Sequence, residues 1–345
     1  MKNEEMPYIQ ASQGKRPETM PIVIEIQSVT APSNKKLREK YGPENVWKSP
    51  ELSARCTVAP ITEVGYDAAI HVSDMSILLE AMGLEVEPSE KGGPRVLNPV
   101  RTAAAVDKLV VPEPEEAMQV WLEAMRIAKK ELTGKVPLLG WVGGPLSVAS
   151  FMIEGGAASG TTPYHHLKTM MHAEPEACHR LFEKLTEAFI RFIPCQVTAG
   201  ADAMMILDLR APAAISPDDF REFSFPYLKR LVNAVKATGV PVMLHSDGTS
   251  FFGSPVADLK VDVLALSWTV DLTEAIRRFD GKQVVQGNLE PYVLFASEKV
   301  IEKKVKALVE AGKEAPAHIF SLGGWIIPAT PFEKAKFLVD LVHSL

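Results

Sequence analysis

Residues 240–247, VPVMLHSD, and residues 261–268, VDVLALSW, are two short apolar segments that each end in a polar or aromatic step. Six further segments of this kind occur along the chain: MPIVIEIQ (20–27), DAAIHVSD (67–74), VPLLGWVGG (136–144), DAMMILD (202–208), KQVVQGN (282–288) and HIFSLGG (317–323). Stretches with helical periodicity separate the eight segments, and strands that alternate with helices indicate βαβ units and a parallel sheet. Eight such units predict a closed (β/α)8 barrel, the TIM barrel.

A barrel of this kind places its reaction site at the carboxyl ends of its strands, where the βα loops begin. We therefore expect one cleft that is shared by the residues ending the eight segments: Gln27, Asp74, Gly143, Asp208, His245, Asp247, Trp268, Asn288 and Gly323. Pro and Gly lie mainly where elements change, which marks loops inside a domain. We interpret residues 1–345 as a single domain.

The composition is that of an ordinary globular protein, with 46% hydrophobic residues, 23% charged residues and a net charge of −6. This mildly acidic balance gives no support for nucleic acid or an anionic membrane surface as a partner. The three cysteines, Cys56, Cys178 and Cys195, form neither a CxxC pair nor an even disulfide set, which favours a reducing compartment. With no apolar core of signal-peptide length in the first twenty residues, we expect a cytoplasmic protein.

Asp74 ends the second predicted strand, where side chains alternate between two faces. Ile70 and Val72 share the face of Asp74, whereas His71 and Ser73 point the other way. A carboxylate at the carboxyl end of a strand can have its pKa moved by desolvation or by a nearby charge, as catalytic acids do. Asp74 can equally be the N-cap of the helical stretch SILLEAMGL that follows it.

Five segments resemble motifs of the uroporphyrinogen decarboxylase family, in the family's order: DAAIHVSDMSILLEAMGLEVE (67–87), LLGWVGGPLSVASFMIEGG (138–156), ALSWTVDL (265–272), QGNLEP (286–291) and FSLGGWIIPATP (320–331). The similarity runs from about residue 16 to the C-terminus, so the resemblance implies a barrel core over about residues 16–345 behind an N-terminal extension.

The resemblance also implies an activity: removal of CO2 from the acetate side chains of a cyclic tetrapyrrole without a cofactor, as in porphyrin biosynthesis. A protonated pyrrole ring is a cationic electron sink, so no metal is required. The family uses an aspartate at the position of Asp74 to stabilise the pyrrole NH groups and the positive charge on the ring, an example of preorganised electrostatics. Family members are often homodimers, which implies a possible homodimer here.

This chain departs from the family where the substrate's carboxylates are held. The family's motif of the form RQAGR is IQSVT here (26–30), and only Gln27 remains. Phe151 occupies the position of a family tyrosine, and Gly324 that of a family histidine. A family serine is also missing from residues 208–212. Arg210 is a candidate replacement cation, and Trp141 with Phe151 is a candidate apolar floor for a flat ring. The missing groups favour a substrate with fewer carboxylates than the eight of uroporphyrinogen.

A second branch of the superfamily transfers methyl groups to or from corrinoids or thiols, with zinc held by a His-x-Cys pair and a distant cysteine. The corresponding residues here are His245, Asp247 and Gly324, a set that lacks the last cysteine, so we expect no metal. His245 and Asp247 can instead act as an acid/base pair or hold a polar group of the substrate. Alternatively, His245 satisfies buried backbone groups and Asp247 forms a turn.

Three functions therefore remain open from the sequence. The leading one is a carboxy-lyase of the uroporphyrinogen decarboxylase type, with Asp74 as the catalytic residue. Its expected substrate-binding residues are Gln27, Trp141, Phe151, Arg210, His245, Asp247 and Gly324. The alternatives are a one-carbon transferase that works with a corrinoid protein and a non-catalytic barrel that binds a tetrapyrrole or another protein.

Overall fold

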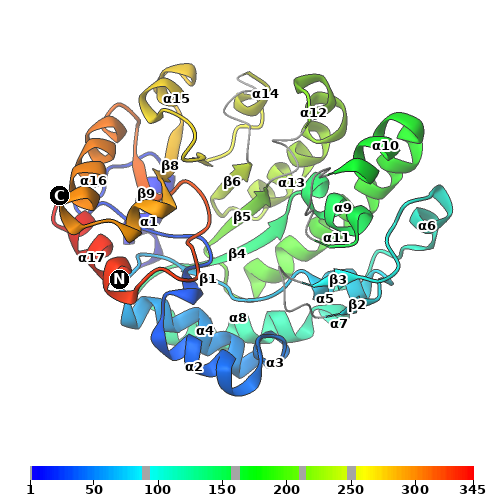
Figure 1. The fold of residues 1–345 in the computed structure, drawn as a ribbon, viewed down its shortest axis with the longest axis horizontal. Coiled ribbons are helices and arrows are strands. Elements are labelled where there is room, and N and C mark those ends of the chain that lie inside the picture. Colours follow the sequence, from blue (N-terminus) through cyan, green and yellow to red (C-terminus); the bar gives the residue numbers. More distant parts are fainter. Residues whose placement is uncertain (1, 88–93, 157–163, 210–214, 247–253) are drawn as a thin grey trace.

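A curled parallel sheet forms the centre of the molecule in the computed structural model, which describes residues 2–87, 94–156, 164–209, 215–246 and 254–345. Seven strands lie side by side in the order β1-β4-β5-β6-β7-β8-β9, so every neighbour in the sheet is also the next sheet strand along the chain (Figure 1). Their bounds are Ala69–Ile70 (β1), Leu138–Gly143 (β4), Ala203–Asp208 (β5), Val242–Ser246 (β6), Val263–Ala265 (β7), Val284–Leu289 (β8) and His318–Leu322 (β9).

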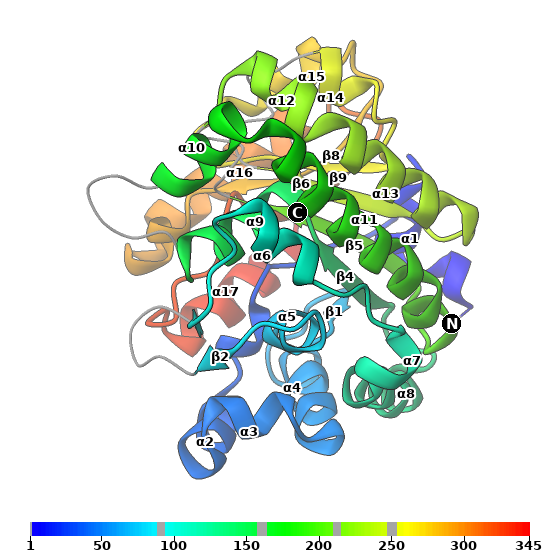
Figure 2. The same cartoon turned by 90° about the vertical axis from the view of Figure 1, so that its right-hand side faces the viewer.

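Helices surround this sheet on its outer side, as Figures 1 and 2 show from two directions. The α-helices are α1 (Pro7–Ser12), α2 (Pro32–Tyr41), α3 (Pro43–Trp47), α4 (Pro50–Glu63), α5 (Ser76–Ala81), α6 (Ala103–Lys108), α7 (Pro114–Ala117), α8 (Gln119–Leu132), α9 (Pro145–Glu154), α10 (His165–Ala173), α11 (Pro175–Thr198), α12 (Pro217–Phe223), α13 (Phe225–Ala237), α14 (Ser254–Ala257), α15 (Leu272–Arg278), α16 (Glu298–Gly312) and α17 (Phe332–His343). Short 3-10 helices are η1 (Asn3–Glu5), η2 (Gln27–Val29) and η5 (Pro291–Phe295). A two-stranded antiparallel pair, β2 (Val86–Glu87) with β3 (Arg95–Val96), was not expected from the sequence.

Seven of the eight predicted strands are present, and the first one is not a regular strand. In residues 20–27, Ile22 makes a single parallel bridge to Phe320 of β9. Its carbonyl oxygen also accepts a hydrogen bond of 3.0 Å from the backbone N–H of Asp67, just before β1. Ile26 then adopts left-handed backbone angles (φ 57°) and η2 follows, which ends the extended segment. The architecture shown is therefore a curled seven-stranded α/β sheet rather than eight paired strands.

The inner face of the sheet is packed by alternate side chains of successive strands, as the two-residue period of a strand requires. This inner core comprises Val23, Ala68, Leu139, Ala203, Met205, Met243, Val263, Ala265, Val284, Ala317 and Ile319, together with Met6, Tyr8, Ile9 and Ala11 from the N-terminal segment. Helix α1 thus fills the amino-terminal end of the sheet's interior, and space for a ligand is left at the opposite end.

The outer face is packed by amphipathic helices. In α11, Pro175 occupies the first turn, where its missing N–H is tolerated, and Leu181, Leu185, Phe189 and Phe192 follow at spacings of three and four residues. All four are buried in the largest apolar cluster, between the helices and the sheet. In the described residues, no helix is both long enough and apolar enough to cross a membrane.

Candidate active site

A cavity of about 630 Å³ opens at the carboxyl ends of β1, β4 and β5. Its wall is mostly apolar and includes Ile70, Trp141, Gly143, Met205 and Leu207 from the strand ends. The volume lies in the usual range for small-molecule sites, and a mostly apolar wall with a few polar groups is typical of them. Five of the residues singled out from the sequence line this cavity: Gln27, Asp74, Trp141, Gly143 and Phe151.

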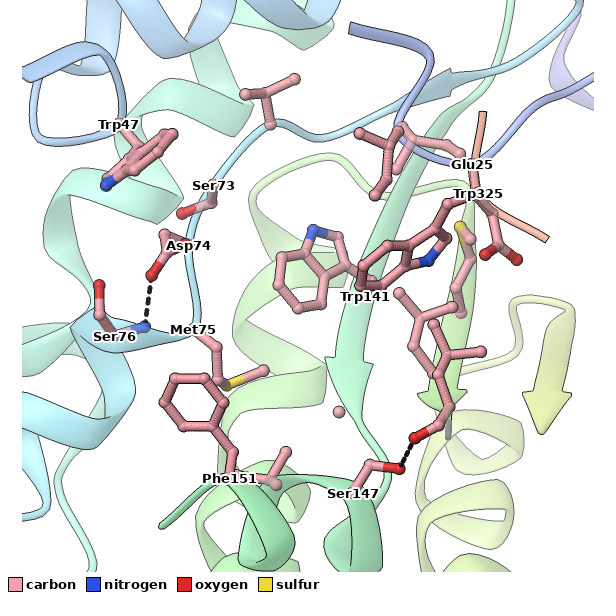
Figure 3. A pocket seen from close by; sticks show the side chains of 18 of the residues that line it. Glu25, Trp47, Ser73, Asp74, Met75, Ser76, Trp141, Ser147, Phe151 and Trp325 are labelled. Atoms are coloured by element: carbon pink, nitrogen blue, oxygen red, sulfur yellow. Dashed lines mark hydrogen bonds between the residues drawn. The ribbon is translucent and has the colours of Figure 1, made fainter. Parts of the chain in front are cut away.

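Asp74 lies on the cavity wall directly before α5. Its Oδ1 accepts a hydrogen bond of 2.8 Å from the backbone N–H of Ser76, as Figure 3 shows. Oδ2 has no hydrogen bond to any other residue of the described ranges, and the side chain is half-buried. The N-cap residue of α5 is Met75, without a side-chain cap, so the N-cap role expected for Asp74 is wrong. Oδ1 instead holds the turn that precedes the helix, and the other oxygen is available to a ligand.

Gln27 and Trp141 are each fixed by a hydrogen bond to the backbone of the second predicted strand. Gln27 is only 1% exposed, and its Nε2 donates to the carbonyl oxygen of Ala68 at 3.1 Å. The indole Nε1 of Trp141 donates to the carbonyl oxygen of His71 at 3.0 Å. Phe151 reaches the cavity from α9. The roles of these residues in substrate binding stay predictions.

His245 lies beside Glu25, a buried carboxylate that the sequence pattern did not suggest as its neighbour. His245 Nδ1 lies 2.6 Å from Glu25 Oε1, and both side chains are buried. Among the described residues that line the cavity, Glu25 is present and His245 is not. His245 thus contacts a carboxylate of the described cavity wall, and its role in substrate binding stays a prediction. Asp247 itself lies outside the described residues, as does Arg210.

Gly324 is also set back from the cavity, since its neighbour Trp325 is on the wall and Gly324 is not among the described residues there. A Cβ at this position would meet the ring of Trp268 at 3.8 Å, which is an ordinary contact. A side chain at position 324 would therefore begin beside the ring of Trp268 without a clash. The substrate-binding role of this position stays a prediction.

Asp208 was expected at the shared cleft, but it is buried away from it. It is 0% exposed, and it is not part of the described cavity wall. Its Oδ1 accepts from the backbone N–H of Ser147 at 3.0 Å, and its Oδ2 accepts from the hydroxyl of Ser224 at 3.1 Å. Ser147 lies in the first turn of α9, so Asp208 caps that helix from a neighbouring strand.

The cavity wall also contains functional groups that the sequence reasoning did not single out, namely Glu25, Arg38, Trp47 and Trp325. Arg38 extends from α2, and its Nη2 donates to Ser28 Oγ at 2.8 Å. Burial lowers the pKa of its guanidinium group, and Nε has no partner within the described ranges. The sequence signal that could have predicted this cation is an arginine eight positions after the end of the IQSVT segment.

His71 borders the cavity but is oriented toward the outer helices, as the alternation of the strand predicts. Its ring centroid lies 5.4 Å from that of Trp121 in α8. The side chain is 2% exposed, and burial lowers its pKa to about 3, so the imidazole is neutral at physiological pH. Neither ring nitrogen has a hydrogen-bond partner within the described ranges.

Across the described ranges, no group of three or more His, Cys, Asp or Glu side chains is arranged to hold a metal ion. The polar groups on the described cavity wall include the carboxylates of Glu25 and Asp74, the amide of Gln27, the guanidinium of Arg38 and several serine hydroxyls. The arrangement can accept hydrogen bonds from a large, mostly apolar ligand and can stabilise positive charge on it.

Comparison with known proteins identifies the family. A family model described as "Uroporphyrinogen decarboxylase (URO-D)" matches residues 3–345. The chain belongs to this family. Similar proteins named uroporphyrinogen decarboxylase include one from Anaeromyxobacter sp. (strain Fw109-5), 43% identical over 91% of this chain and 90% of that protein. Another, from Geobacter sp. (strain M21), is 37% identical over 98% of both chains.

Among solved structures, a methyltransferase from Methanosarcina mazei superposes with a TM-score of 0.80 and 23% identity, covering 100% of this chain and 99% of that one. A B12-independent methionine synthase from Shewanella sp. W3-18-1 superposes with a TM-score of 0.55 and 10% identity over 86% of this chain and 88% of that one. At these identities the likeness concerns the fold alone.

Proposed function

We propose that this protein is a carboxy-lyase that removes CO2 from the acetate side chains of a cyclic tetrapyrrole, with Asp74 as its catalytic residue. The observation that carries the proposal is the position of Asp74, with one oxygen unengaged among the described residues, on an apolar cavity in a chain of the uroporphyrinogen decarboxylase family. Relatives with that name at 36–43% identity support the reaction type.

The chemistry follows from the ring of the substrate. A proton added to a pyrrole carbon makes the ring cationic, and the electrons of the bond to the carboxylate then flow into the ring as CO2 leaves. The carbon that lost CO2 takes up a proton to become a methyl group, and the ring releases the proton that it gained. Asp74 would accept hydrogen bonds from the pyrrole N–H groups and stabilise the positive charge on the ring. Such a preorganised interaction is strongest where water is excluded.

Other groups of the cavity have supporting roles in this proposal. Trp141 and Phe151 offer apolar surface to the flat ring, and Arg38 offers a cation for a substrate carboxylate in place of the arginines missing from residues 26–30. We also propose that residues 21–23 close the sheet into a barrel, since they hydrogen-bond both to Phe320 and to Asp67. A cytoplasmic homodimer is proposed by analogy with the family and from the cysteine pattern.

The test is anaerobic incubation with uroporphyrinogen III, with products resolved by carboxylate number and metal content measured on the same sample. We expect stepwise loss of CO2. Metal-dependent methyl transfer would favour the corrinoid-linked alternative, and tetrapyrrole binding without turnover would favour a non-catalytic barrel.

Asp74→Asn is expected to lower kcat/KM by at least about a hundredfold while the protein stays folded, because it removes the charge opposite the developing cation. Asp271→Asn is a matched control, since Asp271 Oδ1 also accepts a backbone N–H at the start of a helix, from Glu274 at 2.8 Å in α15. Asparagine caps a helix about as well as aspartate, so both variants should unfold like the wild type. Wild-type turnover in Asp74→Asn would remove Asp74 from the mechanism.

A further inference from the structure

Glu25 presents a buried carboxylate oxygen that no group of the described chain satisfies. The side chain is 5% exposed, and it forms part of the cavity wall. Oε1 is engaged by His245 Nδ1 at 2.6 Å, a distance that requires a proton between the two atoms, whereas Oε2 has no hydrogen-bond partner among the described residues. An unsatisfied buried carboxylate oxygen is unfavourable and calls for an explanation, of which a ligand group is one.

Gln27 repeats the pattern two residues further along. It is 1% exposed and lines the same cavity. Its amide orientation is set by donation from Nε2 to the Ala68 carbonyl oxygen at 3.1 Å, which leaves Oε1 as an acceptor without a partner in the described chain. We call Glu25 Oε2 and Gln27 Oε1 together the acceptor subsite.

Glu25 and Asp74 both line the cavity. Figure 3 shows them on opposite sides of the view, with Trp141 drawn between them. One ligand that fills this cavity would lie against both carboxylates and the indole ring. The guanidinium that the described wall contributes, Arg38, donates to Ser28 rather than to Glu25. An ionised carboxylate of a ligand placed at Glu25 would meet a like charge there, and neither of the two acceptor atoms of this subsite can donate a hydrogen bond to it.

We propose that the acceptor subsite binds a hydrogen-bond donor of the substrate, such as a pyrrole N–H, and disfavours an ionised carboxylate. This inference rests on the proposed function and narrows its substrate: the preferred macrocycle carries fewer carboxylates than the eight of uroporphyrinogen. Glu25 is then a specificity-determining residue, and His245 is the positioning residue that holds Oε1 so that Oε2 faces the ligand.

The test measures binding rather than turnover, using the stable porphyrins uroporphyrin III, with eight carboxylates, and coproporphyrin III, with four. Trp47, Trp141 and Trp325 line the cavity, so quenching of tryptophan fluorescence reports occupancy. We expect the wild type to bind the four-carboxylate ligand at least about tenfold more tightly. Glu25→Gln replaces the anionic acceptor by an amide, so it should weaken the binding of coproporphyrin about tenfold and tighten the binding of uroporphyrin. The difference in affinity between the two porphyrins should then become smaller or change sign.

Glu63→Gln is the control, because Glu63 is a half-buried carboxylate in α4 that accepts the backbone N–H of Ser33 at 3.2 Å and is not part of the described cavity wall. It should leave both dissociation constants unchanged. Near-UV circular dichroism checks that Glu25→Gln is folded, and the ligand preference of the wild type tests the proposal without any substitution.

Equal affinity of the wild type for both porphyrins, or equal changes for both in Glu25→Gln, would overturn the inference. A change in thermal stability alone would mean that Oε2 binds only a water molecule, and would overturn it as well. Because decarboxylation is assayed separately, turnover of uroporphyrinogen with no porphyrin preference would refute the acceptor subsite while leaving the proposed function intact. Absence of both porphyrin binding and turnover would refute the two together.

Discussion

Replacement of Asp208 by alanine should destabilise the protein far more than loss of an ordinary helix cap. Asp208 is fully buried at the end of β5, and it joins two separate helical segments by accepting hydrogen bonds from Ser147 in α9 and from Ser224 between α12 and α13. Alanine would leave the Ser147 N–H without this cap and the Ser224 hydroxyl, which is itself 0% exposed, without this acceptor.

The size of the effect follows from these two contacts. A hydrogen bond to a charged group contributes about 1.5–3 kcal/mol, so two of them amount to about 3–6 kcal/mol. Removing a buried carboxylate also relieves its desolvation, which offsets part of that loss. We therefore expect Asp208→Ala to lower the free energy of unfolding by about 3 kcal/mol, toward the lower end of the range. Asp271→Ala, which removes an exposed cap in α15, should lower it by about 1 kcal/mol.

Urea denaturation followed by far-UV circular dichroism measures both variants against the wild type, provided that the slope with denaturant stays the same. A difference of less than about 1 kcal/mol between the two variants would refute the reasoning, because it would mean that the buried contacts of Asp208 are no stronger than an exposed cap. A less stable α9 should also hold the cavity wall less firmly, because Phe151 of that helix lines the cavity.

Two further predictions concern pH. Because burial lowers the pKa of His71 to about 3 from 6.5, the unfolded chain binds a proton between these values that the folded chain does not, and stability falls as the pH falls through this window. His71→Leu should therefore reduce the loss of unfolding free energy between pH 7 and pH 4.5 in urea titrations, and an unchanged loss would contradict this. The hydrogen bond to Asp67, at 2.8 Å, raises the pKa of His343, so the protonated pair stabilises the fold below about pH 6.5 and this contribution disappears as the pH rises through the raised pKa. His343→Gln should be less stable than the wild type at pH 6, by less than about 1 kcal/mol for a half-buried pair, and equal to it at pH 8.5. The same deficit at both pH values would rule out the ionic contribution.

The strands were predictable because each buried strand has a sequence that is apolar and bounded by turn residues. DAMMILD (202–208) corresponds closely to Ala203–Asp208, and HIFSLGG (317–323) to His318–Leu322. MPIVIEIQ (20–27) has the same pattern, yet Ile26 adopts left-handed backbone angles. The segment makes one isolated β-bridge, at Ile22. Local composition does not reveal how many hydrogen bonds a neighbouring strand can offer, so this segment could not be distinguished in advance.

The position of Asp74 on the cavity followed from its place at a strand end, but the contact between His245 and Glu25 did not. Sequence spacing drew attention to Asp247, two residues away, and gave no sign of a carboxylate 220 positions distant. Glu25 was hidden inside a predicted strand, and Arg38 lies on a helix that was not assigned to the site. Pairings between distant elements depend on the curvature of the sheet and on the direction of each side chain, neither of which the linear pattern contains.

The packing of α1 into the base of the sheet fills that end of the described interior with Tyr8 and Ile9. A ligand would therefore enter and leave at the opposite end, where the described cavity opens. If several equivalent acetate arms are processed in turn, each arm has to be brought to Asp74 by tumbling the macrocycle inside the chamber or by letting it escape and return. The order in which partly processed species accumulate in solution would then record which of these two routes the protein follows.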